Sequence, residues 1–335
     1  MKTAVLSDGA WGTALALTLI NNGHEVIQWG PFPEYICELR NSHRNERFLP
    51  GIPLPDNLQF SDDVRVAVED AEIIVLASPS QFMRQTLEKL APFYSSEQIL
   101  VNVAKGIEMG SLKRMSELCS EILGPERSYT VLSGPSHAEE VSKKVPTAVV
   151  VGAENHDDAA KVQKAFMSSN FRVYTSDDVV GIELGGALKN VFAIAAGIID
   201  GMELGDNPKA ALITRGIAEM ARLGVALGGR FETFSGLSGI GDMIVTCTSG
   251  HSRNRYVGEE LGRGKKIEEI QAEMGLVVAE GVKTAESAYH LALKAGVDTP
   301  VINEIYSGIY LDKDPRQGVK DLMNRKAKKE FAEQS

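Results

Sequence analysis

With 335 residues, the chain is too long for one ordinary hydrophobic core, and about two domains are expected. Its hydrophobic and charged fractions, 43% and 24%, are those of a folded globular protein. The formal net charge of −10 argues against a nucleic-acid partner, because proteins that bind nucleic acid concentrate positive charge. An anionic substrate would be repelled at long range. A phosphate site would therefore need a few local cations and backbone N–H groups.

The three cysteines, Cys37, Cys119 and Cys247, lie far apart and form no CxxC pair. This pattern predicts free thiols in a reducing compartment, with neither disulfides nor a metal site. The N-terminus passes directly into the strand-like run Thr3–Leu6, without the pattern of a signal peptide. The longest apolar stretch, Val191–Ile199, is far shorter than the roughly 20 residues of a membrane span. We therefore expect a cytoplasmic protein that does not insert into membranes.

The first half of the chain alternates short β-rich segments with helical ones. Strand, helix and strand in repeated order predict crossover connections and a largely parallel sheet covered on both faces. The prolines of Pro50–Pro55 exclude regular structure there. The predicted strands are Lys2–Leu6, Glu25–Trp29, Ile73–Ala77, Ile99–Ala104, Tyr129–Leu132, Ala148–Val151 and Arg172–Tyr174, and helices between the first four include Gly12–Asn22, Pro33–Asn41 and Gln81–Leu90.

The second half has a different character. After Tyr174 the sequence shows long helical patterns with glycine-rich breaks and no convincing strand. The natural boundary lies within Thr175–Asp178. We therefore predict an α/β domain over residues 1–176 and an all-α domain over residues 177–335.

The first predicted strand runs into a glycine-rich turn, Ser7–Gly12, which has two of the three glycines of GxGxxG. Gly9 would let the backbone approach a pyrophosphate, and Gly12 would let the following helix pack closely on the strand. The helix N-terminus would supply N–H groups for the phosphates. A tight turn that binds no ligand is the alternative interpretation. The turn favours a Rossmann-like dinucleotide-binding domain.

Two residues of this turn depart from the usual pattern. Ser7 replaces the first glycine, so the turn must form without a positive φ at that position. Asp8 places a carboxylate in the phosphate loop, and we hypothesise that it turns beneath the loop and braces it through backbone N–H groups. The second strand is followed by Gly30-Pro31-Phe32, which offers neither an acid for a ribose 2′-OH nor an arginine for a 2′-phosphate. The choice between NAD and NADP is left open.

Other strand ends carry small turn-forming residues and one cation, Lys105. Ligands bind outside the carboxyl ends of strands in an open parallel sheet, so Lys105 is a site candidate, with a surface lysine as the alternative. Ser133-Gly134-Pro135-Ser136 follows another strand. Ser136 and Glu139 also fit a helix capping box, and His137 is expected to be a surface or packing residue.

One lysine, Lys189, interrupts an apolar helix. At helical spacing it shares a face with Gly185, Gly186, Ala193 and Ala196, whose small side chains would leave space for a substrate above the lysine. A partly buried lysine has a lowered pKa and can exchange protons near neutral pH. The alternative is a lysine that extends its ammonium group into water.

Asp242 lies in an apolar, glycine-rich stretch, where a carboxylate should be paired or functional. Lys189 is a plausible partner, and a helix-capping role is the alternative. Ser252, Arg253 and Asn254 open the next helical pattern, and a hydroxyl, a guanidinium and an amide at a helix start suit a phosphate. Ser252 as a simple N-cap, with solvated arginines, is the other interpretation.

Taken together, these segments resemble the bacterial NAD(P)-dependent glycerol-3-phosphate dehydrogenases almost from end to end. The resemblance implies reversible hydride transfer between NAD(P)H and dihydroxyacetone phosphate, giving sn-glycerol 3-phosphate for phospholipid synthesis. The most specific segments are Trp11–Ala16, Lys105–Glu108, Ser133–Glu140, Gly185–Asn190, Ala211–Gly216, Gly241–Asp242, Thr246–Thr248 and Ser252–Asn254.

The resemblance also implies roles for single residues, with Lys189 as the proton donor and acceptor. A cation there can stabilise the negative charge that hydride transfer builds on the carbonyl oxygen. A small phosphate-bearing substrate and a possible homodimer are the expected partners. The implied substrate contacts are Lys105, Gly134, Ser136, Lys189, Asp242, Ser252, Arg253 and Asn254. The expected cofactor contacts are Gly9, Ala10, Trp11, Gly12, Lys105, Ala138, Arg253, Val278 and Glu280.

Two alternatives to this function follow from the same residues. A related hydroxyacid or ketoacid reductase would share the glycine-rich turn and the helix lysine, but Ser252–Asn254 favours a phosphate. A non-catalytic dinucleotide sensor would explain the changes at Ser7 and Asp8, but it would have no need of Lys189 and Asp242.

Overall fold

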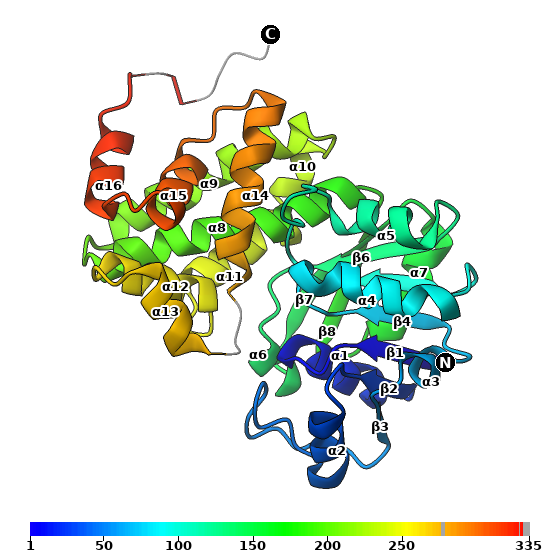
Figure 1. Cartoon of the computed structure of the whole chain (residues 1–335). Coiled ribbons are helices and arrows are strands. Elements are labelled where there is room, and N and C mark those ends of the chain that lie inside the picture. Colours follow the sequence, from blue (N-terminus) through cyan, green and yellow to red (C-terminus); the bar gives the residue numbers. More distant parts are fainter. Residues whose placement is uncertain (276–278, 328, 331–335) are drawn as a thin grey trace.

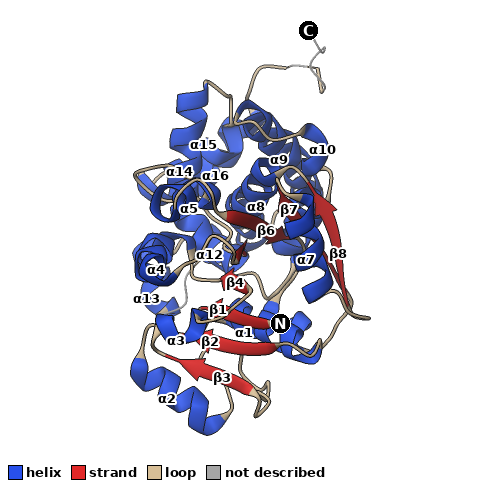
Figure 2. Ribbon diagram, turned by 90° about the vertical axis from the view of Figure 1, so that its right-hand side faces the viewer, coloured by secondary structure: helices blue, strands red, loops and turns tan. Residues whose placement is uncertain are grey.

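The computed structural model describes residues 1–275, 279–327 and 329–330. In that part of the chain, eight strands form one sheet in the order β3-β2-β1-β4-β5-β6-β7-β8 (Figure 2). All neighbours pair in parallel except β6 and β7. The strands are β1 (Lys2–Leu6), β2 (Glu25–Trp29), β3 (Leu58–Ser61), β4 (Ile73–Leu76), β5 (Ile99–Asn102), β6 (Ser128–Ser133), β7 (Thr147–Ala153) and β8 (Phe171–Ser176).

The predicted strands are confirmed with small shifts at their ends, but β3 was missed. Its four residues form an edge strand that follows the proline-rich loop, and so short a segment lacks a clear periodicity. The central strands β4 and β5 are buried along their whole length, as expected for a parallel sheet covered on both faces.

Helices cover the two faces of the sheet. Side chains of α1, α2, α6 and α7 join one apolar core, and those of α3, α4 and α5 join another. These helices are α1 (Ala10–Asn21), α2 (Pro33–Ser42), α3 (Val64–Val68), α4 (Met83–Leu90), α5 (Met115–Leu123), α6 (Ala138–Ser142) and α7 (His156–Phe166), with short 3₁₀ turns η1 (Ser80–Phe82) and η2 (Ala91–Phe93).

The described residues after β8 form helices joined by turns and loops, with no strand, as predicted. The central element of this half is α8, around which the other helices pack (Figure 1). By length and composition α8 could cross a membrane, but its apolar window is 100% buried inside the protein, so it is a core helix. The helices are α8 (Val179–Gly201), α9 (Asp206–Ala226), α10 (Phe231–Phe234), α11 (Asp242–Thr248), α12 (Arg253–Gly262), α13 (Ile267–Met274), α14 (Glu280–Ala295), α15 (Pro300–Tyr310) and α16 (Pro315–Met323), with a π-helical turn, η3 (Leu237–Gly241).

Glycines allow α8 and α12 to pack backbone against backbone. A Cβ on Gly197 would lie 1.9 Å from the carbonyl oxygen of Arg255, and one on Gly258 would lie 1.9 Å from that of Ile194. Any side chain at these positions would force the helices apart. This close contact positions the N-terminus of α12 beside the middle of α8.

Candidate active site

Lys189 lies in the middle of α8 and is only 6% exposed. Its Nζ donates hydrogen bonds to Asp242 Oδ1 at 2.7 Å and to Thr246 Oγ1 at 2.7 Å. Burial lowers the pKa of Lys189 to about 8; the charge of Asp242 opposes this shift and that of Lys105 adds to it. The alternative of an ammonium group extended into water is wrong. The structure supplies a lysine that can exchange a proton near neutral pH.

Asp242 bridges two lysines. Its Oδ2 accepts a hydrogen bond from Lys105 Nζ at 2.6 Å, while Oδ1 accepts from Lys189. Burial acts to raise the pKa of Asp242, but the charges of Lys105 and Lys189 outweigh it, so the pKa is lowered and the carboxylate stays ionised. The predicted pairing of Lys189 with Asp242 is confirmed, and Lys105 is not a free surface lysine. Asp242 is presented by the π-helical turn η3, a feature often found at functional sites.

The two glycines on the Lys189 face of α8 are in contact with protein and do not border open space. A Cβ on Gly185 would lie 2.7 Å from the carbonyl oxygen of Ser238, and one on Gly186 would lie 2.8 Å from Ser133 Oγ at the end of β6. The prediction that these glycines leave room for a substrate is therefore wrong. Their lack of side chains instead lets η3 and the end of β6 approach α8 closely.

A chain of asparagines supports the ion cluster, and sequence reasoning missed its first member. Asn190 Nδ2 donates to the backbone oxygen of Lys105 at 3.1 Å, and Asn254 Nδ2 donates to Asn190 Oδ1 at 2.9 Å. Asn254 Oδ1 in turn accepts from the N–H of Gly281 at 2.9 Å. The side chain of Asn254 thus joins α8, α12 and α14. An amide next to Lys189 in an otherwise apolar helix was the signal for Asn190.

The start of α12 holds a guanidinium that pairs with none of the described side chains. Ser252 Oγ accepts from the N–H of Arg255 at 3.2 Å, so Ser252 is the helix N-cap. Arg255 is bound to Asp200 at 2.6 Å. Arg253, by contrast, is exposed, and its side chain forms no hydrogen bond or ion pair with any described residue. A free guanidinium beside helix N–H groups is suited to an anion.

The glycine-rich turn adopts the predicted geometry. Gly9 is the N-cap of α1, and Ala10 and Trp11 begin the helix. A Cβ on Gly12 would lie 2.8 Å from the carbonyl oxygen of Ser7, so close packing of helix on strand requires this glycine. The first N–H groups of α1 therefore face the carboxyl ends of β1 and β4, where a pyrophosphate fits.

Ser7, and not Asp8, braces this turn. Ser7 Oγ accepts from the N–H of Gly9 at 3.1 Å, and the turn needs no positive φ at Ser7. The carboxylate of Asp8 lies against Gly30 at the end of β2. The bracing role hypothesised for Asp8 belongs to the neighbouring hydroxyl.

Gly134 is the central residue of the hydrogen bonds in the loop after β6. The carbonyl oxygen of Gly134 accepts hydrogen bonds from Lys105 Nζ at 3.0 Å and from Ser136 Oγ at 2.8 Å. The backbone of Gly134 has a positive φ of 140°. The capping box predicted at Ser136 is wrong, because His137 is the N-cap of α6 and Ser136 bonds backward to Gly134.

Two of the remaining cofactor candidates, Glu280 and Ala138, lie at the same edge of the sheet. Glu280, the first residue of α14, accepts the N–H of Ser80 at 2.8 Å and so connects α14 to the turn after β4. Ala138 is the buried first residue of α6. Val278 lies outside the described residues.

Several buried polar atoms at this edge of the sheet have no hydrogen-bond partner among the described residues. In a folded protein nearly all such atoms are hydrogen-bonded. Here atoms of the glycine-rich turn, the end of β6, the start of α6 and α14 lack a partner within the structure. They are Asp8 Oδ2, Trp11 Nε1, Ser133 Oγ, His137 Nε2 and Thr284 Oγ1.

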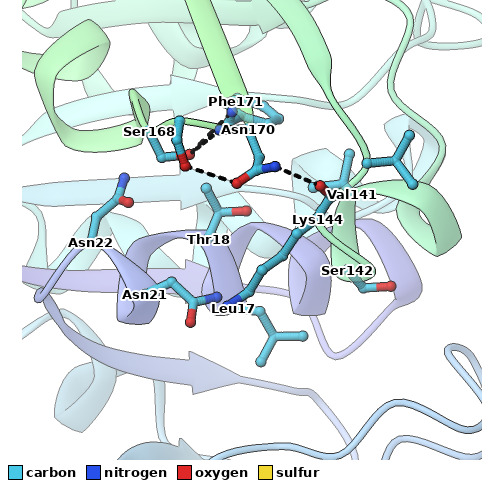
Figure 3. A pocket seen from close by; sticks show the side chains of 12 residues that line it. Leu17, Thr18, Asn21, Asn22, Val141, Ser142, Lys144, Ser168, Asn170 and Phe171 are labelled. Carbon is cyan, nitrogen blue, oxygen red and sulfur yellow. Dashed lines mark hydrogen bonds between the residues drawn. The ribbon is translucent and has the colours of Figure 1, made fainter.

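A separate pocket of about 190 Å³ lies at the other end of α1 (Figure 3). Asn22, Lys144 and Asn170 line it. The 12 residues of α1 place it about 18 Å from the glycine-rich turn. It is therefore not the cofactor site.

A parallel sheet with a glycine-rich turn, joined to helices that bury a lysine, defines a nicotinamide-dependent oxidoreductase. Residues 2–159 match the family described as NAD-dependent glycerol-3-phosphate dehydrogenase N-terminus, and residues 178–320 match its C-terminus. The chain belongs to the NAD-dependent glycerol-3-phosphate dehydrogenase family.

Relatives support this membership along the whole chain. Glycerol-3-phosphate dehydrogenases [NAD(P)+] of Chlorobium phaeobacteroides and Lysinibacillus sphaericus are each 50% identical to this chain. Both matches cover 99% of this chain, and they cover 99% of the Chlorobium protein and 98% of the Lysinibacillus protein. The crystal structure of glycerol-3-phosphate dehydrogenase from Coxiella burnetii has a TM-score of 0.93 and 36% identity, and the match covers 96% of this chain and 98% of that one.

Proposed function

We propose that the protein interconverts dihydroxyacetone phosphate and sn-glycerol 3-phosphate with NAD(P)H. The observation that carries this proposal is the buried cluster of Lys189, Asp242 and Lys105 beside the free guanidinium of Arg253. Residues 1–176 form the dinucleotide-binding unit and residues 177–335 the substrate unit. The names of the relatives support the same reaction.

The ion cluster is suited to proton transfer. The reduced nicotinamide, when bound, supplies the hydride. Lys189 donates two of its three N–H groups to Asp242 and Thr246. No other described residue accepts from it, so the third is available to the carbonyl oxygen of the substrate. Lys189 stabilises the negative charge that develops there and donates its proton from Nζ. In the reverse direction, neutral Lys189 accepts the proton of the hydroxyl group.

The other residues position the two ligands. Asp242 holds Lys189 in place, and Lys105 keeps Asp242 ionised, so the donated proton comes from the lysine. The turn Gly9–Gly12 would hold the cofactor, with Lys105, Ala138, Arg253 and Glu280 as further contacts. The substrate is surrounded by Lys105, Gly134, Ser136, Lys189, Asp242, Ser252, Arg253 and Asn254.

The reaction itself is tested by adding dihydroxyacetone phosphate to the protein with NADH or NADPH. A loss of the reduced-nicotinamide absorbance, with sn-glycerol 3-phosphate as product, is expected. If NADH or NADPH is oxidised only when a ketoacid with a carboxylate is added, the related reductase function is favoured instead.

Removal of the phosphate anchor should show in KM. Arg253→Ala is expected to weaken binding of dihydroxyacetone phosphate by about 1.5–3 kcal/mol, the range for a hydrogen bond to a charged group. Dihydroxyacetone has no phosphate, so its KM should hardly change. Steady-state kinetics on both substrates measure the difference, and Arg65→Ala, at an exposed arginine on α3, is the control. Equal losses on both substrates would make Arg253 a structural residue.

Activity should depend on the protonation state of Lys189, whose pKa is lowered to about 8. Reduction needs the protonated lysine, so its kcat should be level below pH 8 and fall as pH rises above it. Oxidation needs the neutral lysine, so its kcat should rise with pH up to about 8 and then level off. Profiles of kcat in both directions check this, and two profiles of the same sign would contradict it.

The cellular setting is part of the proposal. The free cysteines and negative net charge support a cytoplasmic protein that binds a small phosphate-bearing substrate and no nucleic acid. The sn-glycerol 3-phosphate produced would serve phospholipid synthesis. A homodimer is also proposed, and light scattering of the purified protein tests it.

A further inference from the structure

The end of β2 lacks the side chain that usually discriminates between NAD and NADP. In sheets of this kind, an acid near this point binds the adenosine ribose hydroxyls of NAD, or an arginine accepts the 2′-phosphate of NADP. Gly30, Pro31 and Phe32 follow β2 here, and none has a polar side chain.

A carboxylate reaches this place from the neighbouring strand. Leu6 of β1 pairs with Trp29 of β2, so the two strands end at the same level. Asp8 follows β1, and its Oδ2 lies 2.7 Å from where a Cβ on Gly30 would be. A side chain at position 30 would displace the carboxylate. The glycine at the end of β2 therefore makes room for an acid supplied by β1.

The backbone of Asp8 is held rigidly. Asn45 Nδ2 donates to the carbonyl oxygen of Asp8 at 2.7 Å and to Thr13 Oγ1 at 2.8 Å. Asn45 Oδ1 accepts from the hydroxyl of Tyr35 at 2.7 Å. All these groups are buried, so the carboxylate is positioned before any ligand arrives.

The carboxylate of Asp8 has an unsatisfied hydrogen-bond acceptor among the described residues. Asp8 is 7% exposed, and its buried Oδ2 has no hydrogen-bond partner in the described part of the chain. Burial raises the pKa of Asp8, while its own backbone N–H and the charge of Arg47 oppose the rise. Arg47 is exposed and lies over the ring of Tyr35, with its guanidinium carbon 4.3 Å from the ring centroid. An unsatisfied buried acceptor is costly, and a ribose hydroxyl would satisfy it.

We propose that Asp8 accepts a hydrogen bond from the adenosine ribose of the cofactor and makes the protein selective for NADH over NADPH. A 2′-phosphate would bring a second negative charge against this carboxylate, in a site of low dielectric where repulsion is strong. Asp8 thus replaces the missing acid of β2. This inference rests on the proposed function only in that the ligand is a nicotinamide dinucleotide.

The test is direct titration of the full-length protein with NADH and with NADPH, followed by nicotinamide fluorescence and without any substrate. Wild-type protein should bind NADH more tightly. Asp8→Ala should weaken the binding of NADH roughly ten- to hundredfold, the equivalent of one hydrogen bond to a charged group. The same variant should not weaken the binding of NADPH. Asp8→Asn keeps the size of the side chain and should shift the ratio of the two Kd values in the same direction.

The matched control is Asp62→Ala. Asp62 is an exposed carboxylate just after β3, the strand next to β2, and its removal changes the net charge by the same amount. It should leave the ratio of the two Kd values unchanged. A double variant, Asp8→Ala with Arg47→Ala, should bind NADPH less tightly than Asp8→Ala alone, because Arg47 is the nearby cation for a 2′-phosphate.

Several results would overturn the inference. Tighter binding of NADPH by the wild-type protein is one, and equal weakening of both cofactors in the Asp8 variants, the sign of a structural role, is another. If neither variant folds, competition on the wild-type protein decides: adenosine 5′-monophosphate should compete better than adenosine 2′,5′-bisphosphate. Failure of the proposed function looks different, because the selectivity for NADH would persist without turnover of dihydroxyacetone phosphate.

Discussion

Lys189→Met is expected to lower kcat for dihydroxyacetone phosphate reduction by about 10²–10⁴-fold, the usual contribution of a general acid. Methionine nearly matches the length of lysine and is apolar, so the buried position in α8 is kept filled. Asp242 retains its ion pair with Lys105 at 2.6 Å, so the variant should fold. Binding of NADH, measured by fluorescence, should be unchanged, because the loss lies in the proton transfer.

Lys189→Arg separates charge from proton donation. Arginine keeps the positive charge, but its pKa lies above about 12, so it does not release a proton near neutral pH. Its kcat should therefore be low as well. Recovery of most of the wild-type kcat in Lys189→Arg would show that the residue acts by its charge alone, and near-normal turnover in Lys189→Met would remove Lys189 from the chemistry.

Asp242→Ala is expected to have the largest effect on stability. It leaves Lys189 and Lys105 close together and without their shared counter-charge, and breaking a buried ion pair costs about 3–5 kcal/mol. Without the carboxylate the pKa of Lys189 should fall further, because the charge of Asp242 now opposes the effect of burial. Thermal denaturation measures the first effect. In the pH profile of reduction, the decline in kcat should lie at a lower pH than in the wild-type protein, where it centres on about pH 8.

Two comparisons support the interpretation of this variant. Asp242→Asn keeps the size and part of the hydrogen bonding, so it should fold better while showing the same shift of the pH profile. Asp177→Ala breaks the exposed pair with Arg230 and should change thermal stability little, because solvent screens such pairs. An unchanged pH profile in both Asp242 variants would mean that the carboxylate does not tune Lys189.

Much of the fold follows from local patterns in the sequence. Alternating β-rich and helical segments predicted the parallel sheet, and the absence of strand patterns after Tyr174 predicted the helical half. Ser7–Gly12 could be identified from glycine spacing because a strand–turn–helix connection needs small residues at fixed positions. The edge strand Leu58–Ser61 was missed, since its pairing with β2 is a contact that its own residues do not encode.

Only the tertiary structure decided what surrounds the site residues. Gly185 and Gly186 have the spacing expected of an open face, yet residues far along the chain, Ser238 and Ser133, fill that face. The same holds for Asp8, whose direction depends on the missing side chain of Gly30. By itself the sequence determined which residue types carry the chemistry and on which elements they lie. Which atoms meet was decided by packing between segments more than 20 residues apart, since hydrogen bonds and charges act over a few ångströms in space irrespective of chain order.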